Sequence, residues 1–378
     1  MTASRRQSTN RQSAEAGHIT RAGFLKTAAL GVAGVAFGAQ AGSAVAAPRA
    51  QTAGSGGTLN LYTWEEYFAP SNINGFEKAS GAHVNIATYT SNDQEYATLL
   101  TAAGDNYDIT IPSASFIPLM VQHGLLLKLD KSRIPFQYVD KRFLGDQSDP
   151  HNDYSVPKDY GVIGILYDPA VVKSPLKTWQ DFLDAGAQPG VSGKVQMASV
   201  PDDVLAPALW AKNISTNTDS VEQLKAAGKT MIAFNKHVKT YNGFDTDGAV
   251  NGTYAMSEMT NGTARLAVLQ KPSLKFVVPE PQSEIFVDYY TILAKGPDHD
   301  QAYAFIKYML QPAQQVAEAA YIGYPTVLPD LASKLPSKTP DRADLLTAPS
   351  IVARCKQHRV HTNVQQLIET LYTEITAG

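Results

Sequence analysis

Acidic and aromatic residues stand near the predicted ends of strands along this 378-residue chain. The set comprises Trp64, Glu66, Tyr67, Ser113, Asp203, Phe286, Asp288 and Tyr324. An alkylammonium ion needs carboxylates for its charge, because an unpaired charge removed from water is very costly. Aromatic faces suit a methylene chain and add cation–π energies of about 0.5–2 kcal/mol each. The residue types therefore predict a site for an organic cation.

Asp288 is the most informative member of this set. It stands directly before the apolar, β-prone run 289–294, with Phe286 two residues earlier. Such a run reads as a buried strand, where a carboxylate is costly to ionise unless a positive group meets it. The alternatives are a solvated strand edge for Asp288 and a core role for the aromatics. Asp203 is equally an acid in the first turn of a helix.

Strands alternate with helices in the first part of the chain. The pattern predicts strands over 58–64, 82–89 and 107–112, and helices over 71–79, 92–103 and 116–123. This alternation indicates a parallel α/β sheet, in which ligands sit off the carboxyl ends of the strands. The segment 64–67 and Ser113 fall at such ends.

A second α/β block covers about 170–280. Its predicted helices are 178–185, 202–212 and 219–237, and its predicted strands are 194–198 and 274–278. Helices over 301–310, 313–320 and about 363–376 complete the chain. A chain of 378 residues that is 44% hydrophobic exceeds the size of one hydrophobic core, so two domains are expected.

The first 46 residues predict a cleavable export segment. Five basic residues precede a small-residue apolar run over 27–41, and Ala44-Val45-Ala46 fits a cleavage site. Thr20–Lys26 resembles a twin-arginine motif in which Ala22 replaces the second arginine. No cysteine lies near the cleavage site, which argues against a lipoprotein anchor. Removing this segment leaves 27 basic and 34 acidic residues, a net charge of −7. That balance argues against nucleic acid and suits a cationic ligand.

Other motifs give weaker signals. The single cysteine, Cys355, excludes an intrachain disulfide and a cysteine-based zinc site. His358-x-x-His361 lacks a recognisable acidic third ligand, so we expect a solvated helical face there rather than a metal site. Tyr289-Tyr290 could supply phenolates to ferric ion, but neighbouring strand residues face opposite ways, so we expect one in the core and one outside. No nucleophile motif is evident, and we expect no catalytic residue, metal or cofactor.

Several blocks in order resemble the periplasmic spermidine/putrescine-binding proteins of ABC importers. They are Leu59–Tyr67, Asn106–Ser113, Asn152–Pro157, Ile285–Asp288 and Ile322–Thr326. The resemblance covers the chain from about residue 57 to its end. It implies a two-lobed periplasmic-binding-protein fold of type II, with a ligand cleft between lobes joined by crossover strands near 162–167 and 289–294 and a third passage before the last helix.

The resemblance also implies the roles of the set named first, with Asp288 holding an ammonium group. It implies a domain division into 1–46 (export segment), 47–57 (linker), 58–165 with 287–345 (lobe I) and 166–286 with 346–378 (lobe II). Three positions depart from the family pattern. Ser115 and Thr260 stand where aromatics are expected, and Val200 stands where an acid is expected. A diamine shorter than spermidine, or another cation, thus becomes an option.

We therefore expect an exported, monomeric solute-binding protein of the periplasm that captures a putrescine- or spermidine-like cation. Its partners would be a membrane ABC permease and its ATPase. The alternatives are the same fold binding another organic cation or ferric ion, a sensory partner that presents ligand to a receptor, and a secreted hydrolase or transferase.

Overall fold

The computed structural model describes residues 56–377, apart from 244, 338, 340–346 and 362. Internal contacts divide the chain into Met1–Gln51 and Thr52–Gly378, and all the described residues belong to the second unit. The predicted export segment and its cleavage site lie outside the described residues. Within the described part of the chain, no helix combines the length and the apolar character that crossing a membrane requires.

Three parallel strands begin the sheet, in the order β2 (His83–Tyr89), β1 (Thr58–Trp64), β3 (Ile109–Thr110). Helices α2 (Pro70–Ser80), α3 (Asn92–Leu99) and α4 (Ile117–Gln122) accompany them. Helix α3 ends before the predicted residue 103 because the hydroxyl of Thr101 bonds to the carbonyl of Thr98 and accepts the N–H of Ala103. These local bonds compete with the helical ones.

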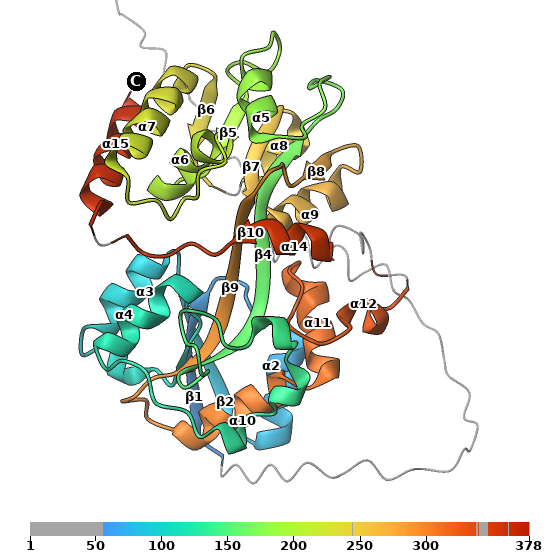
Figure 1. The fold of residues 1–378 in the computed structure, drawn as a ribbon. Coiled ribbons are helices and arrows are strands. Elements are labelled where there is room, and N and C mark those ends of the chain that lie inside the picture. The colour runs from blue at the N-terminus through green and yellow to red at the C-terminus, as the bar shows by residue number, and fades with distance from the viewer. Residues whose placement is uncertain (1–55, 244, 338, 340–346, 362, 378) are drawn as a thin grey trace, which may run out of the picture. The chain divides into compact units, whose positions relative to one another are not determined.

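Two long antiparallel strands, β4 (Ser155–Tyr167) and β9 (Ser283–Ile292), join two hydrophobic cores (Figure 1). Strand β9 pairs with β3 near its end, whereas the last third of β4 pairs with β7 (Met256–Thr260). Along β4, Val162 packs into the first core and Ile163 into the second. The predicted two-lobed α/β fold with crossover strands is confirmed.

The second core surrounds β7, β5 (Val195–Met197) and β6 (Val238–Tyr241), which are parallel. Helices α5 (Trp179–Gly186), α6 (Pro201–Trp210), α7 (Val221–Asn235) and α15 (Gln365–Ala377) supply its side chains. The sequence patterns did not predict β6, β7 or the helices α8 (Thr246–Asn251) and α9 (Asn261–Gln270). Strand β8 (Lys275–Val277) pairs with the end of β4.

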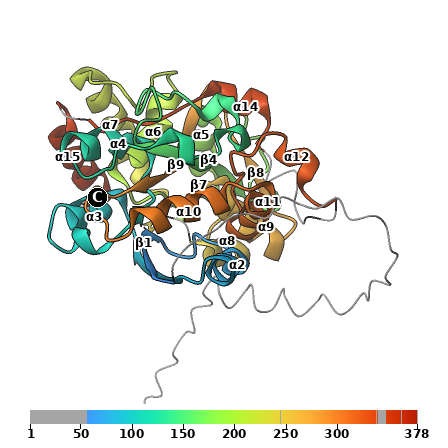
Figure 2. The same ribbon diagram turned by 90° about the horizontal axis from the view of Figure 1, so that it is seen from below.

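Helices α10 (His299–Met309) and α11 (Pro312–Ile322) pack with α2 and contribute to the first core (Figure 2). Short helices α12 (Leu331–Lys334) and α14 (Pro349–Arg354) follow. Single 3-10 turns occupy Gly104–Asn106, Ala114–Phe116, Lys131–Arg133, Phe136–Tyr138 and Lys141–Phe143.

The chain passes between the cores a third time before the last helix. Strand β10 (Cys355–Lys356) pairs with the start of β9, and Cys355 belongs to the first core, whereas Val364 belongs to the second. Burial raises the pKa of the Cys355 thiol to about 11.

The expectation that Tyr289 and Tyr290 face opposite environments is wrong. Their side chains point to opposite faces of β9, yet both are buried, at 1% and 2% exposure. Helices cover both faces of this part of the sheet, so each face is interior. Burial also raises the pKa of both phenols, which opposes the phenolate form that ferric ion would need.

We expect Ile165→Ala to lower the free energy of unfolding by about 2–5 kcal/mol, because it leaves a cavity in the second core near the end of β4. Ile165 is fully buried, whereas Ile86 on β2 is 46% exposed and provides the matched control. Ile86→Ala should cost about 1 kcal/mol or less. Urea denaturation of the two variants measures the difference, and equal losses would contradict the burial of this end of β4 in the second core.

Candidate functional site

Two carboxylates face each other across the central strand pair. Asp159 of β4 and Asp288 of β9 are direct partners in the antiparallel register. Their exposures are 0% and 3%. Like charges directly opposite each other destabilise a sheet, and burial makes each charge more costly. This pairing therefore needs protons or cations to be stable.

A phenol bridges the two acids. The Tyr67 hydroxyl lies 2.6 Å from Asp159 Oδ1 and 2.5 Å from Asp288 Oδ2. One phenol carries one proton, so both contacts are hydrogen bonds only when one of the carboxyls is itself protonated. Burial, then the charge of Asp159, raises the pKa of Asp288 to about 7. Burial thus favours uptake of the extra proton by Asp288 as the pH falls through neutral.

Lys158 neutralises the other acid. Its ammonium lies 2.6 Å from Asp159 Oδ2, 3.9 Å from Glu318 Oε2 and 3.9 Å from the centre of the Tyr67 ring. The register of β4 against β9 shifts between Pro157 and Asp159. Such a bulge re-aims a side chain, which brings Lys158 beside its neighbour. With Asp159 and Glu318 sharing this lysine, Asp288 is the acid left for an external cation.

Ser113 completes the surroundings of Asp288. Its hydroxyl donates to Asp288 Oδ1 at 2.6 Å. Asn92, the first residue of α3, holds Ser113 by accepting its backbone N–H at 3.0 Å and donating to its hydroxyl at 3.2 Å. The ends of β1 and β3 thus supply Tyr67 and Ser113, as expected for the carboxyl edge of a parallel sheet.

The predicted aromatics lie on either side of this cluster. The Phe286 and Tyr324 rings pack edge-to-face at 5.3 Å, and Tyr324 lies 6.4 Å from Tyr67. The Tyr324 hydroxyl contacts Thr260 Oγ1 at 2.8 Å. Trp64 donates its indole N–H to the carbonyl of Ile111, farther toward β2.

The two remaining predicted acids are Glu66 and Asp203. Glu66 occupies the turn after β1 with a left-handed φ of 54°, partly buried. Asp203 begins α6 and interacts with a second group of acids, Asp202, Glu258 and Glu284. The structure thus brings Tyr67, Ser113, Phe286, Asp288 and Tyr324 together and places Asp203 in a separate cluster.

The second cluster is also short of positive charge. Burial, then the charge of Asp203, raises the pKa of Glu284 to about 8 and that of Glu258 well above its usual range. His358 opposes this effect on Glu284. Glu258 is fully buried on β7, and one of its carboxyl oxygens has no hydrogen-bond partner among the described residues. Neutral acids or a bound cation would relieve this repulsion.

The expected solvated helical face for His358 and His361 is wrong. Neither residue belongs to a helix, and His361 is only 2% exposed. Side-chain atoms of Asp202, His358 and His361 that could bind a metal all lie within 4.8 Å of one another.

Sequence reasoning missed five charged residues of these clusters, Lys158, Asp159, Glu258, Glu284 and Glu318. Two signals were available. Lys158-Asp159 interrupts an otherwise apolar strand of 13 residues. Glu284 precedes Phe286 and Asp288 by two and four residues, so the three share one face of β9. Glu258 gave no signal, because its strand was not predicted.

We expect Asp288→Asn to change how stability depends on pH. A carboxyl whose folded pKa is about 7, against about 3.9 unfolded, contributes stability at low pH that is lost as the pH rises from about 4 to about 7. Asparagine cannot contribute in this way. The stability of the variant relative to the native chain should therefore rise by about 2 kcal/mol between about pH 5 and about pH 8, as measured by urea denaturation.

Asp300→Asn is the control for this comparison, because the Asp300 side chain is 89% exposed and only its ion pair with Arg133 would be lost. Its relative stability should not follow the same pH profile. A parallel profile for Asp288→Asn and the native chain would contradict a protonated Asp288.

Comparisons with known proteins identify the family of the chain. Residues 73–344 match the family model described as bacterial extracellular solute-binding protein. The chain is 31% identical over 286 residues to the spermidine/putrescine-binding periplasmic protein of Escherichia coli, covering 73% of this chain and 79% of the relative. It is 27% identical over 331 residues to spermidine/putrescine-binding periplasmic protein 1 of Haemophilus influenzae, covering 86% and 91%.

Solved structures give the same fold. The crystal structure of a spermidine/putrescine ABC transporter substrate-binding protein from Streptococcus pneumoniae aligns with a TM-score of 0.76 at 24% identity, over 85% of this chain and 98% of the other. The two hydrophobic cores, the crossover strands and the family match lead to one assignment. The chain belongs to the bacterial extracellular solute-binding proteins.

Proposed function

We propose that this protein is exported to the periplasm, captures a polyamine between its lobes and delivers it to an ABC permease with its ATPase. The observation that carries the proposal is Asp288, a buried acid that lies beside aromatic rings and lacks a cation of its own. The names of the relatives support a polyamine as the ligand. We further propose that the protein acts as a monomer, without nucleic acid and without catalysis.

The chemistry of the site follows from charge balance. Lys158 is already paired, so an ammonium group at Asp288 would bind the carboxylate form in place of the extra proton. The rings of Tyr67, Phe286 and Tyr324 would cover the methylene groups next to it. Binding contacts from both lobes favour the closed form over the open one, and the permease would recognise that form.

The second acidic cluster favours a ligand with at least two amino groups. Glu284, Phe286 and Asp288 alternate along one face of β9, so the two acids stand about 13 Å apart at their Cα atoms. An ammonium group at each end would neutralise one cluster each. A monoamine would satisfy Asp288 only.

Calorimetry with putrescine, cadaverine and spermidine tests the proposal, with butylamine as the singly charged comparison. We expect heat with at least one of the three and weaker binding of butylamine. The polyamine assignment fails if none of them binds.

Asp288→Asn should weaken binding of the preferred amine by about tenfold or more, because a charge-assisted hydrogen bond is worth about 1.5–3 kcal/mol. Asp300→Asn, at an exposed carboxylate, should leave it unchanged. An affinity that survives the loss of Asp288 would remove that residue from the site.

Glu284→Gln should distinguish the contributions of the two amino groups of the ligand to binding. We expect it to weaken the diamine by about tenfold while butylamine binds as before, since only the second ammonium loses its partner. Equal effects on both ligands would show that Glu284 acts on the fold rather than on the far amino group.

A further inference from the structure

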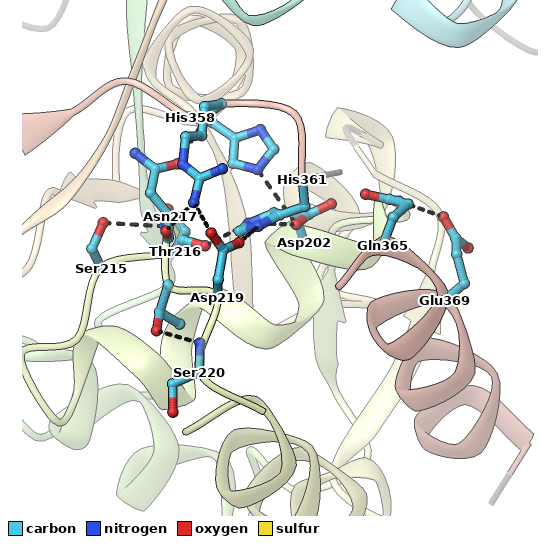
Figure 3. Close-up of polar contacts among 12 residues, drawn as sticks. Asp202, Ser215, Thr216, Asn217, Asp219, Ser220, His358, His361, Gln365 and Glu369 are labelled. Carbon is cyan, nitrogen blue, oxygen red and sulfur yellow. Dashed lines mark hydrogen bonds and ion pairs between the residues drawn. The ribbon is translucent and has the colours of Figure 1, made fainter. Parts of the chain in front are cut away.

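We propose that Asp202, His358 and His361 form a binding site for one zinc ion, which adjoins the second acidic cluster and does not depend on an amine bound at Asp288. Figure 3 shows the three side chains converging from the start of α6 and from the segment between β10 and α15. Asp202 Oδ1 lies 3.4 Å from His358 Nε2 and 3.7 Å from His361 Nε2. Two imidazoles and one carboxylate are a common protein ligand set for zinc.

The distances from Asp202 Oδ1 to the two histidine nitrogens are close to the edge of a zinc tetrahedron. Zinc–ligand bonds of about 2.0–2.1 Å place neighbouring donors about 3.3 Å apart in a tetrahedron, and only about 2.9 Å apart in an octahedron. The observed 3.4 and 3.7 Å lie nearer the tetrahedral edge. Calcium and magnesium prefer oxygen ligands, so two imidazole nitrogens disfavour both ions.

The residues behind His361 are arranged as a metal-bound histidine requires. Its Nδ1 lies 3.0 Å from Asp219 Oδ1, which leaves Nε2 on the side of Thr216 and Asp202. A carboxylate behind a histidine in this way fixes the ring and raises its basicity as a ligand. Arg359 in turn holds Asp219 Oδ2 at 2.5 Å. Figure 3 shows Asp219 beside the His361 ring.

The two histidines differ in their present contacts. His358 Nε2 is buried and faces Asp202 Oδ1 at 3.4 Å, which is longer than an ordinary hydrogen bond. His361 Nε2 differs, because it lies 2.9 Å from the carbonyl oxygen of Thr216. Zinc would replace the proton that this nitrogen donates, and the freed carbonyl offers a fourth oxygen beside the three side chains. The neighbouring Asp203 and Glu284 add negative potential that attracts a dication.

A zinc ion here would cross-link the third chain segment that passes between the cores to helix α6. The segment 357–361 already contacts the loop before α7, where Asn217 donates to the carbonyl of Gln357 at 2.7 Å and accepts from the backbone of Arg359 at 2.9 Å. Zinc would add coordinate bonds from this segment to α6. We assign it a structural role at the base of the second lobe.

The test is a zinc titration of the purified full chain after treatment with a chelator. We expect saturable binding of one zinc ion and a higher unfolding temperature with excess zinc, because an ion that binds only the folded state stabilises it. Cobalt(II) in place of zinc should give the intense visible absorption of a four-coordinate ion. No saturable zinc binding, a weak six-coordinate cobalt spectrum, or equal binding of calcium would each overturn the proposal.

Variants locate the site. His358→Ala should weaken zinc binding by more than about 100-fold, and Asp219→Asn, which removes the carboxylate behind His361 together with its ion pair to Arg359, by about 10–100-fold. His151→Ala is the matched control, because His151 is exposed and should not affect binding. Unchanged affinity in both His358→Ala and Asp219→Asn would overturn the assignment even if zinc bound elsewhere. The milder Asp219 variant keeps the test decisive if His358→Ala fails to fold.

Discussion

The structure depends on a shortage of positive charge at the centre of the β4–β9 pair. The register sets Asp159 against Asp288, and the fold offers Lys158, the phenol of Tyr67 and the hydroxyl of Ser113 to balance them. These groups satisfy Asp159 fully but leave Asp288 dependent on a proton. Burying an incompletely balanced acid costs stability, so a protein that keeps one gains most when a cation arrives.

The shortage of positive charge extends along β9 from the first core to the second. Glu284 belongs to the second acidic cluster and Asp288 to the first, with the Phe286 ring between them on one face of β9. A flexible ligand with separated positive charges matches that pattern better than a compact ion. His358, in the segment between β10 and α15, also lies beside the second cluster. Its charge therefore affects Glu284 on this face of β9.

Local patterns in the sequence predicted much of the fold. Alternating apolar residues marked β1, and Gly81 marked the end of α2, because strand alternation and helix caps depend on near neighbours. Asp288 and Phe286 were predictable as a polar–aromatic pair on a buried strand.

The ion pair between Lys158 and Asp159 was not predictable, because it depends on a bulge that only the pairing with β9 reveals. Asp203 was predicted beside Asp288, but its neighbours are set by how α6 meets β7 and β9, which spacing along the chain does not encode. His358 and His361 were read as a helical pair, whereas they lie in an extended segment whose burial comes from long-range contacts.

The buried thiol of Cys355 has a practical consequence. It is the single cysteine of the sequence, and a pKa of about 11 keeps it in the unreactive thiol form at neutral pH. We therefore expect thiol-specific dyes not to label the native chain. A donor and an acceptor fluorophore on one introduced surface cysteine in each lobe would report opening and closing in real time, without first removing the natural residue.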